Sequence, residues 1–117
     1  MVKREGISIQ ILDTTASGKS LIVDYHYYGQ ELPPDAKAHA KMSKRFYFDL
    51  RLLGLTGGNA TVGISHESVE AGCRIQHWEK ESGRWVDHDA VVDPQSGTIT
   101  AKFDVLKLNG SPIVIGT

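Results

Sequence analysis

Apolar and polar residues alternate with a period of two along most of this chain, a pattern typical of β-strands with one buried face. Ile7–Ile11, Leu21–Tyr28, Arg45–Leu55 and Ala60–Ser65 each show it, and a loop is predicted over Asp13–Ser20. The residues expected to face a core are Ile7, Ile9, Ile11, Leu21, Val23, Tyr25, Tyr27, Phe46, Phe48, Leu50, Leu52, Ala60, Val62 and Ile64.

The stretch from Arg74 to Val105 carries the densest strand signal. Two turn sequences, Glu81–Gly83 and Asp93–Gly97, separate three runs that are rich in Trp, Val, Ile and Thr. Short strands joined by such turns are typical of an antiparallel meander. We therefore expect three consecutive strands here.

Gly29–Lys44 interrupts the alternation. Two prolines are followed by Asp35 and several good helix formers, so Asp35 is a candidate cap for one or two helical turns over Ala36–Met42. The alternative is an irregular surface crossover between two sheets. Residues 1–117 are thus expected to form one all-β domain, an antiparallel β-sandwich of two sheets and about seven or eight strands.

Composition narrows the functional classes. The 117 residues are 40% hydrophobic and 23% charged, which are values of a globular domain that needs no disulfide or metal to fold. The net charge of -1 gives no global field for nucleic acid, so no nucleic-acid partner is expected. Basic residues nevertheless gather at Lys37, Lys41, Lys44 and Arg45, which is either a solvated face or a contact for an acidic partner or polymer.

The remaining motif signals exclude more than they establish. Gly18-Lys19-Ser20 resembles the end of a phosphate-binding loop, but Asp13 occupies the position of its first glycine and the following run looks like a strand. Cys73, the single cysteine, is expected to be a small buried residue. No other spacing indicates a cofactor or a catalytic group, so we predict no cofactor and no enzymatic activity.

The turn at Lys80–Gly83 allows a register to be predicted. If these four residues form the turn, Trp78 faces Trp85, and His77 and His88 lie diagonally on one face. The two histidines are then candidate ligands of a shared metal ion. Structural histidines on a half-exposed strand are the alternative, and a metal-dependent enzyme built on this pair ranks third among the functions considered.

The tryptophans also allow two interpretations. A facing pair inside a core would add about 0.5 to 1.5 kcal/mol beyond its buried area and would fix the register. Alternatively, Trp78 and Trp85 are exposed and stack on sugar rings, and Tyr27, Tyr28 and Tyr47 extend the platform. Exposure of the two indole rings decides between them.

Five segments of the second half of the chain share one order of strand and turn sequences. They are Phe46–Leu50, Gly54–Val62, Trp78–Trp85, Gly97–Phe103 and Pro112–Gly116. In this order, over roughly residues 45–116, the chain resembles the choice-of-anchor or immunoglobulin-like β-sandwich domains near the carboxyl end of many bacterial and archaeal surface proteins. The resemblance implies a non-enzymatic structural or interaction module with a protein or polysaccharide partner, and an immunoglobulin-like sandwich as the fold; carbohydrate binding is the alternative.

The chain departs from these modules before its last strand. Related modules often carry an acidic, glycine-rich stretch that looks able to hold calcium, whereas Lys102–Gly110 offers only Asp104 and Asn109. Calcium binding therefore does not carry over. The expected location depends on whether the chain is part of a longer protein. If it is, we expect a cell-surface or secreted module; if the chain is complete as written, we expect a cytoplasmic protein. Neither an export signal nor a membrane span of ~18 apolar residues is predicted, and the oligomeric state stays open.

Overall fold

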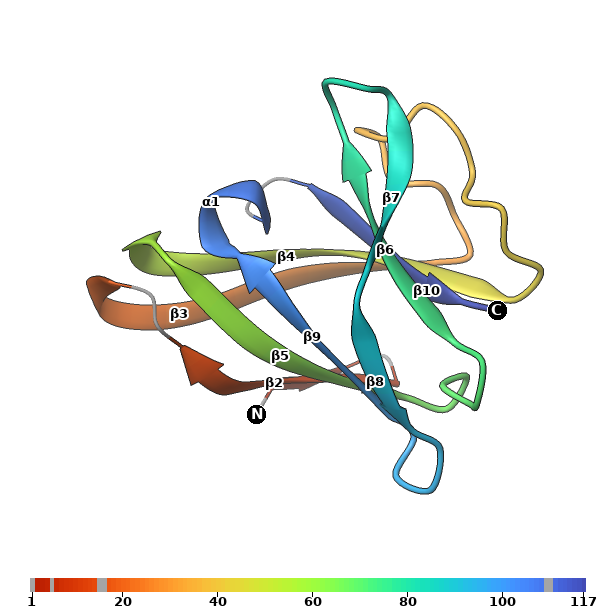
Figure 1. Cartoon of the computed structure of the whole chain (residues 1–117), viewed down its shortest axis with the longest axis horizontal. Coiled ribbons are helices and arrows are strands. Elements are labelled where there is room, and N and C mark those ends of the chain that lie inside the picture. Colours follow the sequence, from red (N-terminus) through yellow and green to blue (C-terminus); the bar gives the residue numbers. More distant parts are fainter. Residues whose placement is uncertain (1, 5, 15–16, 109–110) are drawn as a thin grey trace.

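The computed structural model describes residues 2–4, 6–14, 17–108 and 111–117. These residues form two five-stranded sheets whose neighbouring strands are all antiparallel, which confirms the predicted all-β, two-sheet sandwich (Figure 1). The elements are β1 (Val2–Arg4), β2 (Ile7–Thr14), β3 (Ser17–Gly29), β4 (Arg45–Gly57), β5 (Asn59–His66), β6 (Arg74–Glu79), β7 (Arg84–His88), β8 (Ala90–Asp93), β9 (Thr98–Asp104), α1 (Val105–Leu108) and β10 (Pro112–Gly116).

The first sheet has the strand order β1-β2-β5-β9-β8, and the second has the order β3-β4-β10-β6-β7. The described residues thus contain ten strands, so the expected seven or eight was too low. The additional strands are β1, near the amino terminus, and β8, which was not separated from its neighbours in the sequence.

The main core lies between the two sheets, where their inner faces meet. The predicted inward residues of β4 and β5 are all buried, as the alternation in the sequence indicated. Val23, Tyr25 and Tyr27 on β3 are partly buried and pack against this core. The side chain of Leu21 lies outside the described residues. The buried set from β4 and β5 is Phe46, Phe48, Leu50, Leu52, Ala60, Val62 and Ile64.

Two strand boundaries differ from expectation. The loop predicted over Asp13–Ser20 is much shorter, because Asp13 and Thr14 belong to β2 and Ser17–Ser20 belong to β3; Thr15 and Ala16 lie outside the described residues. At the other end, β9 stops at Asp104, so Val105 is helical rather than extended. Asp104 accepts a hydrogen bond from the backbone N–H of Leu106 at 2.9 Å, which caps the single turn of α1.

The predicted meander is only partly correct. β6 and β7 form a hairpin in the second sheet, but β8 and β9 pair in the first sheet. The chain runs from β7 to β8 through Asp89 alone and changes sheets there, as Figure 1 shows. A change of sheet without a turn is how strands make the corners of sandwiches. The Arg74–Val105 stretch therefore contains two hairpins on different sheets, joined by Asp89.

Residues 30–44, named here the covering loop, form turns and bends without a helix. They connect β3 to β4, which are neighbours in the second sheet, so the predicted crossover between sheets is wrong. The loop instead packs on the outer face of that sheet, where Ala40 and Met42 form a second apolar cluster with Tyr47 and Val114. The backbone N–H of Ala40 donates to the Tyr47 hydroxyl at 3.1 Å, which replaces a helical hydrogen bond.

The last strand, β10, lies in the middle of the second sheet, between β4 and β6. All five of its residues are buried. Gly116 leaves no space for a side chain, because a Cβ atom there would collide with the backbone carbonyl of Lys44. Thr117 continues this contact by donating its backbone N–H to the same carbonyl at 3.0 Å.

Candidate functional site

The β6–β7 hairpin has the register that the sequence predicted. Trp78 faces Trp85, and His77 faces Val86 one position along. The turn between the strands is closed by a hydrogen bond of 2.8 Å from the Gly83 N–H to the Glu79 carbonyl, and Gly83 adopts a φ of 67° that favours glycine. The turn therefore fixes which side chains share each face of the hairpin.

The tryptophan pair belongs to the outer face of the second sheet. The ring centroids of Trp78 and Trp85 are 5.4 Å apart with an interplanar angle of 69°, an edge-to-face contact. Trp78 is only 3% exposed, whereas Trp85 is half-buried. Trp85 donates its Nε1–H to the carbonyl of Ala38 in the covering loop at 2.7 Å, and its ring lies 5.5 Å from that of Tyr47. The pair thus helps to hold the loop on the sheet.

The tyrosines do not extend this pair into one platform. Tyr47 is fully buried. Tyr27 lies on the core side of β3, where its hydroxyl hydrogen-bonds to Nε2 of His66 at 2.9 Å. Tyr28 lies on the outer face and donates to Oδ2 of Asp49 at 3.0 Å. Of the five aromatic residues proposed from the sequence, Trp85 and Tyr28 are the two that lie partly exposed on the outer face.

A cavity of about 360 Å³ lies between the covering loop and the β6–β7 hairpin. The ring of Trp85 forms part of its apolar wall. Three basic side chains, Lys41, Arg74 and Arg84, come from three different segments, and no carboxylate lines it. The complete lining is Ala38, His39, Lys41, Arg74, Gln76, Trp78, Gly83, Arg84 and Trp85.

Gln76 and Asp87 hold the floor of this cavity in place. Gln76 is 8% exposed, and its Nε2 donates to Oδ1 of Asp87 at 2.7 Å across the hairpin. Arg74 reaches the same carboxylate oxygen at 3.6 Å and also donates to the carbonyl of Lys41 at 3.3 Å. Oε1 of Gln76 is buried and accepts no hydrogen bond from any described residue. The cavity therefore includes a fixed amide whose oxygen is unsatisfied.

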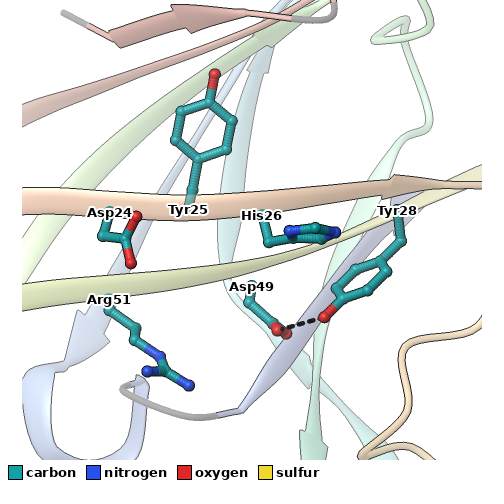
Figure 2. Close-up of a pocket in the computed structure, with 6 residues that line it drawn as sticks. All are labelled: Asp24, Tyr25, His26, Tyr28, Asp49 and Arg51. Atoms are coloured by element: carbon teal, nitrogen blue, oxygen red, sulfur yellow. Dashed lines mark hydrogen bonds between the residues drawn. The ribbon is translucent and has the colours of Figure 1, made fainter.

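A second cavity, of about 240 Å³, lies on the same outer face over β3 and β4. Figure 2 shows Tyr28 bonded to Asp49 there, with Arg51 nearby. Burial, together with the hydrogen bond to Asp49 and the negative charge of that carboxylate, raises the pKa of Tyr28 to about 12. Burial likewise raises the pKa of the Asp49 carboxyl above its ordinary value. The remaining lining residues are Asp24, Tyr25 and His26.

The two histidines proposed as metal ligands lie together on the inner side of the hairpin. The ring centroids of His77 and His88 are 4.4 Å apart, and Nε2 of His88 hydrogen-bonds to Nδ1 of His77. Burial lowers the pKa of both, and the positive charge of protonated His77 further lowers the pKa of His88. Each ring therefore already uses one nitrogen in the pair. Across the described residues, no group of three or more His, Cys, Asp or Glu side chains could hold a metal ion.

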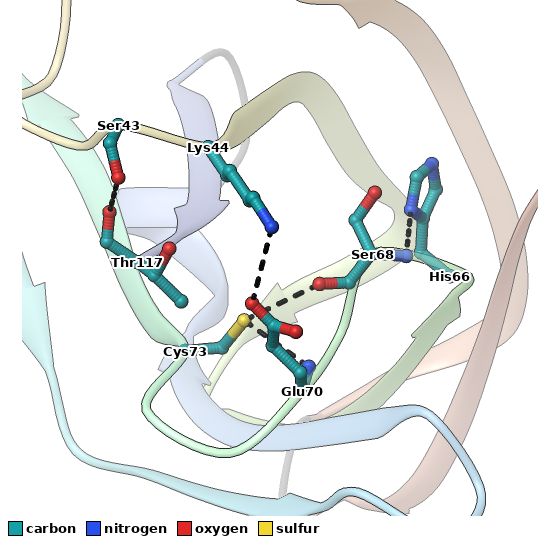
Figure 3. A network of polar contacts seen from close by, with 7 residues as sticks. All are labelled: Ser43, Lys44, His66, Ser68, Glu70, Cys73 and Thr117. Carbon is teal, nitrogen blue, oxygen red and sulfur yellow. Dashed lines mark hydrogen bonds and ion pairs between the residues drawn. The ribbon is translucent and has the colours of Figure 1, made fainter.

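Cys73 and His66 belong to a separate polar network near the end of β5, shown in Figure 3. Cys73 is buried, as predicted, and its Sγ contacts the backbone of Glu70 at 3.4 Å and of Ser68 at 3.6 Å. Nδ1 of His66 accepts the Ser68 N–H at 3.0 Å, and its ring stacks on Phe46 with centroids 4.0 Å apart. Burial lowers the pKa of His66. These contacts fix the loop between β5 and β6.

Sequence reasoning singled out Trp85 and placed Lys41 in the basic segment, but it missed Arg74, Gln76 and Asp49. The alternation on β6 places Arg74 and Gln76 on the same face as Trp78, which was the available signal. What the alternation could not show is that the covering loop, from elsewhere in the chain, closes one side of that face.

No protein-family model, curated protein or solved structure matches this chain. The described residues contain no apolar helix of membrane-spanning length.

Proposed function

We propose that this protein is a non-enzymatic interaction module of a cell-surface or secreted protein, and that it binds its partner through the outer face of the second sheet. The observation that carries the proposal is the cavity of about 360 Å³ beside Trp85. Binding cavities of proteins are typically concave sites of ~300–1,000 Å³ with aromatic walls and a few fixed polar groups. This cavity has both features.

The half-buried titratable groups with shifted pKa values are bound to structural partners, which supports the non-enzymatic part of the proposal. His77 and His88 bond to each other, and Tyr28 bonds to Asp49. His66 is held by Ser68 on one nitrogen and by Tyr27 on the other. Groups with shifted pKa values are candidates for catalysis, but ion-pair and hydrogen-bond networks shift pKa values as well. Here each shifted group has a structural partner.

The surface location rests on the resemblance of residues 45–116 to modules of bacterial and archaeal surface proteins. It is tested by treating intact cells of the source organism with a protease that cannot cross membranes. For a surface protein, we expect protease treatment of intact cells to abolish detection of the protein by an antibody. For a secreted protein, we expect the antibody to detect it in the medium. Full protection in intact cells, with digestion only after lysis, would refute the location. A cytoplasmic enzyme serves as the lysis control.

Carbohydrate binding is the second candidate, and the half-buried ring of Trp85 in the cavity wall favours it. The sugar would stack on the ring of Trp85 alone, beside polar side chains, and not on a platform of five aromatic residues. The test is retention on immobilised neutral and acidic polysaccharides, with wild type compared with Trp85→Ala. Retention of the wild type alone supports the candidate, and equal behaviour of both proteins on every polymer contradicts it.

A further inference from the structure

We propose that the cavity beside Trp85 binds an acidic sugar, with its carboxylate among Lys41, Arg74 and Arg84 and its ring on the indole of Trp85. This inference rests on the proposed function as an interaction module and names the class of its ligand. Nothing in the resemblance to surface modules assigns such a ligand.

The positive charge of the cavity lining favours an anionic ligand. Three basic side chains line the cavity, one from the covering loop, one from β6 and one from the first residue of β7, whereas its lining includes no carboxylate. The chain as a whole has a net charge of -1, so this concentration of positive charge is local. Asp87, across the hairpin from Gln76, pairs with Arg74 and offsets its charge, so the excess positive charge of the lining comes from Lys41 and Arg84. An anionic ligand is therefore favoured over a neutral one.

The shape and polarity of the cavity favour a sugar ring as the body of that ligand. Trp85 is held in a fixed orientation by its bond to Ala38 and by its contacts with Trp78 and Tyr47. A flat, fixed indole offers an apolar surface to the C–H face of a sugar ring, and its immobility reduces the entropy cost of binding. Gln76 also lines the cavity, and its Oε1 has no hydrogen-bond partner among the described residues.

The position of the cavity separates a sugar from an acidic peptide. Extended peptides commonly bind by adding a strand to the free edge of a sheet. This cavity instead lies over the face of β6, which already pairs with β10 on one side and with β7 on the other. A peptide strand at the β7 edge would leave much of the cavity unused, whereas a sugar can enter it from the outer face.

The test is titration of the probes into the whole protein, with binding measured by tryptophan fluorescence and by calorimetry. The probes are trisaccharides of galacturonate and glucuronate, the same sugars with their carboxyl groups reduced to alcohols, and triglutamate. We expect at least one uronate probe to bind roughly tenfold more tightly than its reduced form and than triglutamate at low ionic strength, with the advantage shrinking as salt screens the charges.

Single substitutions locate the binding. Arg84→Gln and Lys41→Gln each remove one exposed charge and are expected to weaken uronate binding roughly threefold, the scale of an exposed ion pair. Lys102→Gln, on the exposed side of β9 in the first sheet, is the matched control and is expected to leave binding unchanged. Equal losses in all three variants would show that net charge alone attracts the sugar, which would overturn the proposed site.

The other outcomes are equally decisive. Equal binding of the reduced sugars would overturn the acidic ligand and leave a carbohydrate module. Preferred binding of triglutamate would overturn the sugar and leave an interaction module for acidic peptides. No binding of any probe would overturn the inference, while the cell-surface protease experiment would still judge the proposed function separately.

Discussion

The two faces of the β6–β7 hairpin carry aromatic pairs of opposite character. On the outer face, Trp78 and Trp85 meet edge to face under the covering loop. On the inner face, His77 and His88 are hydrogen-bonded near Phe103 of the first sheet. One register produces both pairs. The tryptophan pair stabilises the fold by burying apolar surface, whereas the contribution of the histidine pair depends on the protonation state of its rings. The comparison shows that register alone does not assign a role.

The largest expected effect comes from the outer face. Trp78→Ala removes a side chain that is 3% exposed and leaves a cavity beneath the covering loop, so we expect the free energy of unfolding to fall by about 3–5 kcal/mol. Urea denaturation measures the loss. Val91→Ala, at an exposed side chain on β8, is the control. A loss below 1 kcal/mol for Trp78→Ala would mean that the pair does not support the fold.

Acid is expected to act through the inner face, with a smaller effect. The pKa of His77 and of His88 is lowered in the folded protein. The unfolded chain therefore binds more protons as the pH falls below the ordinary histidine value of about 6.5. This contribution to stability is complete above that value and is lost as the pH falls toward the lowered pKa. Nearby Glu79, Asp87, Asp89 and Lys107 also contribute to the local field.

The acid effect is measured by urea denaturation between pH 7.5 and 5.5. The double variant His77→Gln/His88→Gln is expected to depend less on pH than the wild type. His66, whose pKa is also lowered, remains in both proteins and provides the background. Identical pH dependence in the two proteins would show that the inner pair is not the acid-sensitive element.

A third prediction separates the ring of Trp85 from its polar atom. Trp85→Phe keeps an aromatic ring but removes the Nε1–H donor to the Ala38 carbonyl. We expect a loss of about 1 kcal/mol, the usual net value of one hydrogen bond, together with faster amide exchange in the covering loop. Unchanged exchange in residues 30–44 would show that the tryptophan does not hold the loop.

The smallest effect concerns metal binding at the inner pair. Zinc must compete with the hydrogen bond between His77 and His88, and these two rings supply only two ligands. We therefore expect at most a small rise in melting temperature with equimolar zinc, absent in the His77→Gln/His88→Gln variant. A large rise in melting temperature that also occurs in the variant would show that zinc binds at another site.

The sequence predicted local relations well and distant ones poorly. The turn before Arg84 was enough to pair Trp78 with Trp85, because a hairpin's register is set by its own loop. Nothing local distinguishes Asp89 as the residue where the chain changes sheets, because that change depends on the distant strands with which β7 and β8 share their sheets. Of the two alternatives for residues 30–44, the irregular segment is the one observed, and the Ala40 N–H donates to the buried Tyr47 hydroxyl instead of to a helical carbonyl.

The candidate site shows the same limit. Lys41 and Trp85 were each noticed separately, but 44 positions of sequence separate them and only the folded second sheet brings them to one cavity. Gln76 looked like an ordinary polar strand residue. Its burial follows from the covering loop and from Asp87 beside it, which a single-residue pattern cannot reveal.

The central place of β10 has a consequence for biosynthesis. The second sheet joins β3 and β4 to the β6–β7 hairpin only through residues 112–116. During translation both halves are made before the strand that unites them, so the nascent chain exposes two unpaired inner edges until that strand emerges. Such edges invite pairing with other chains. Premature termination before Pro112 is therefore expected to produce a species that depends on chaperones and aggregates.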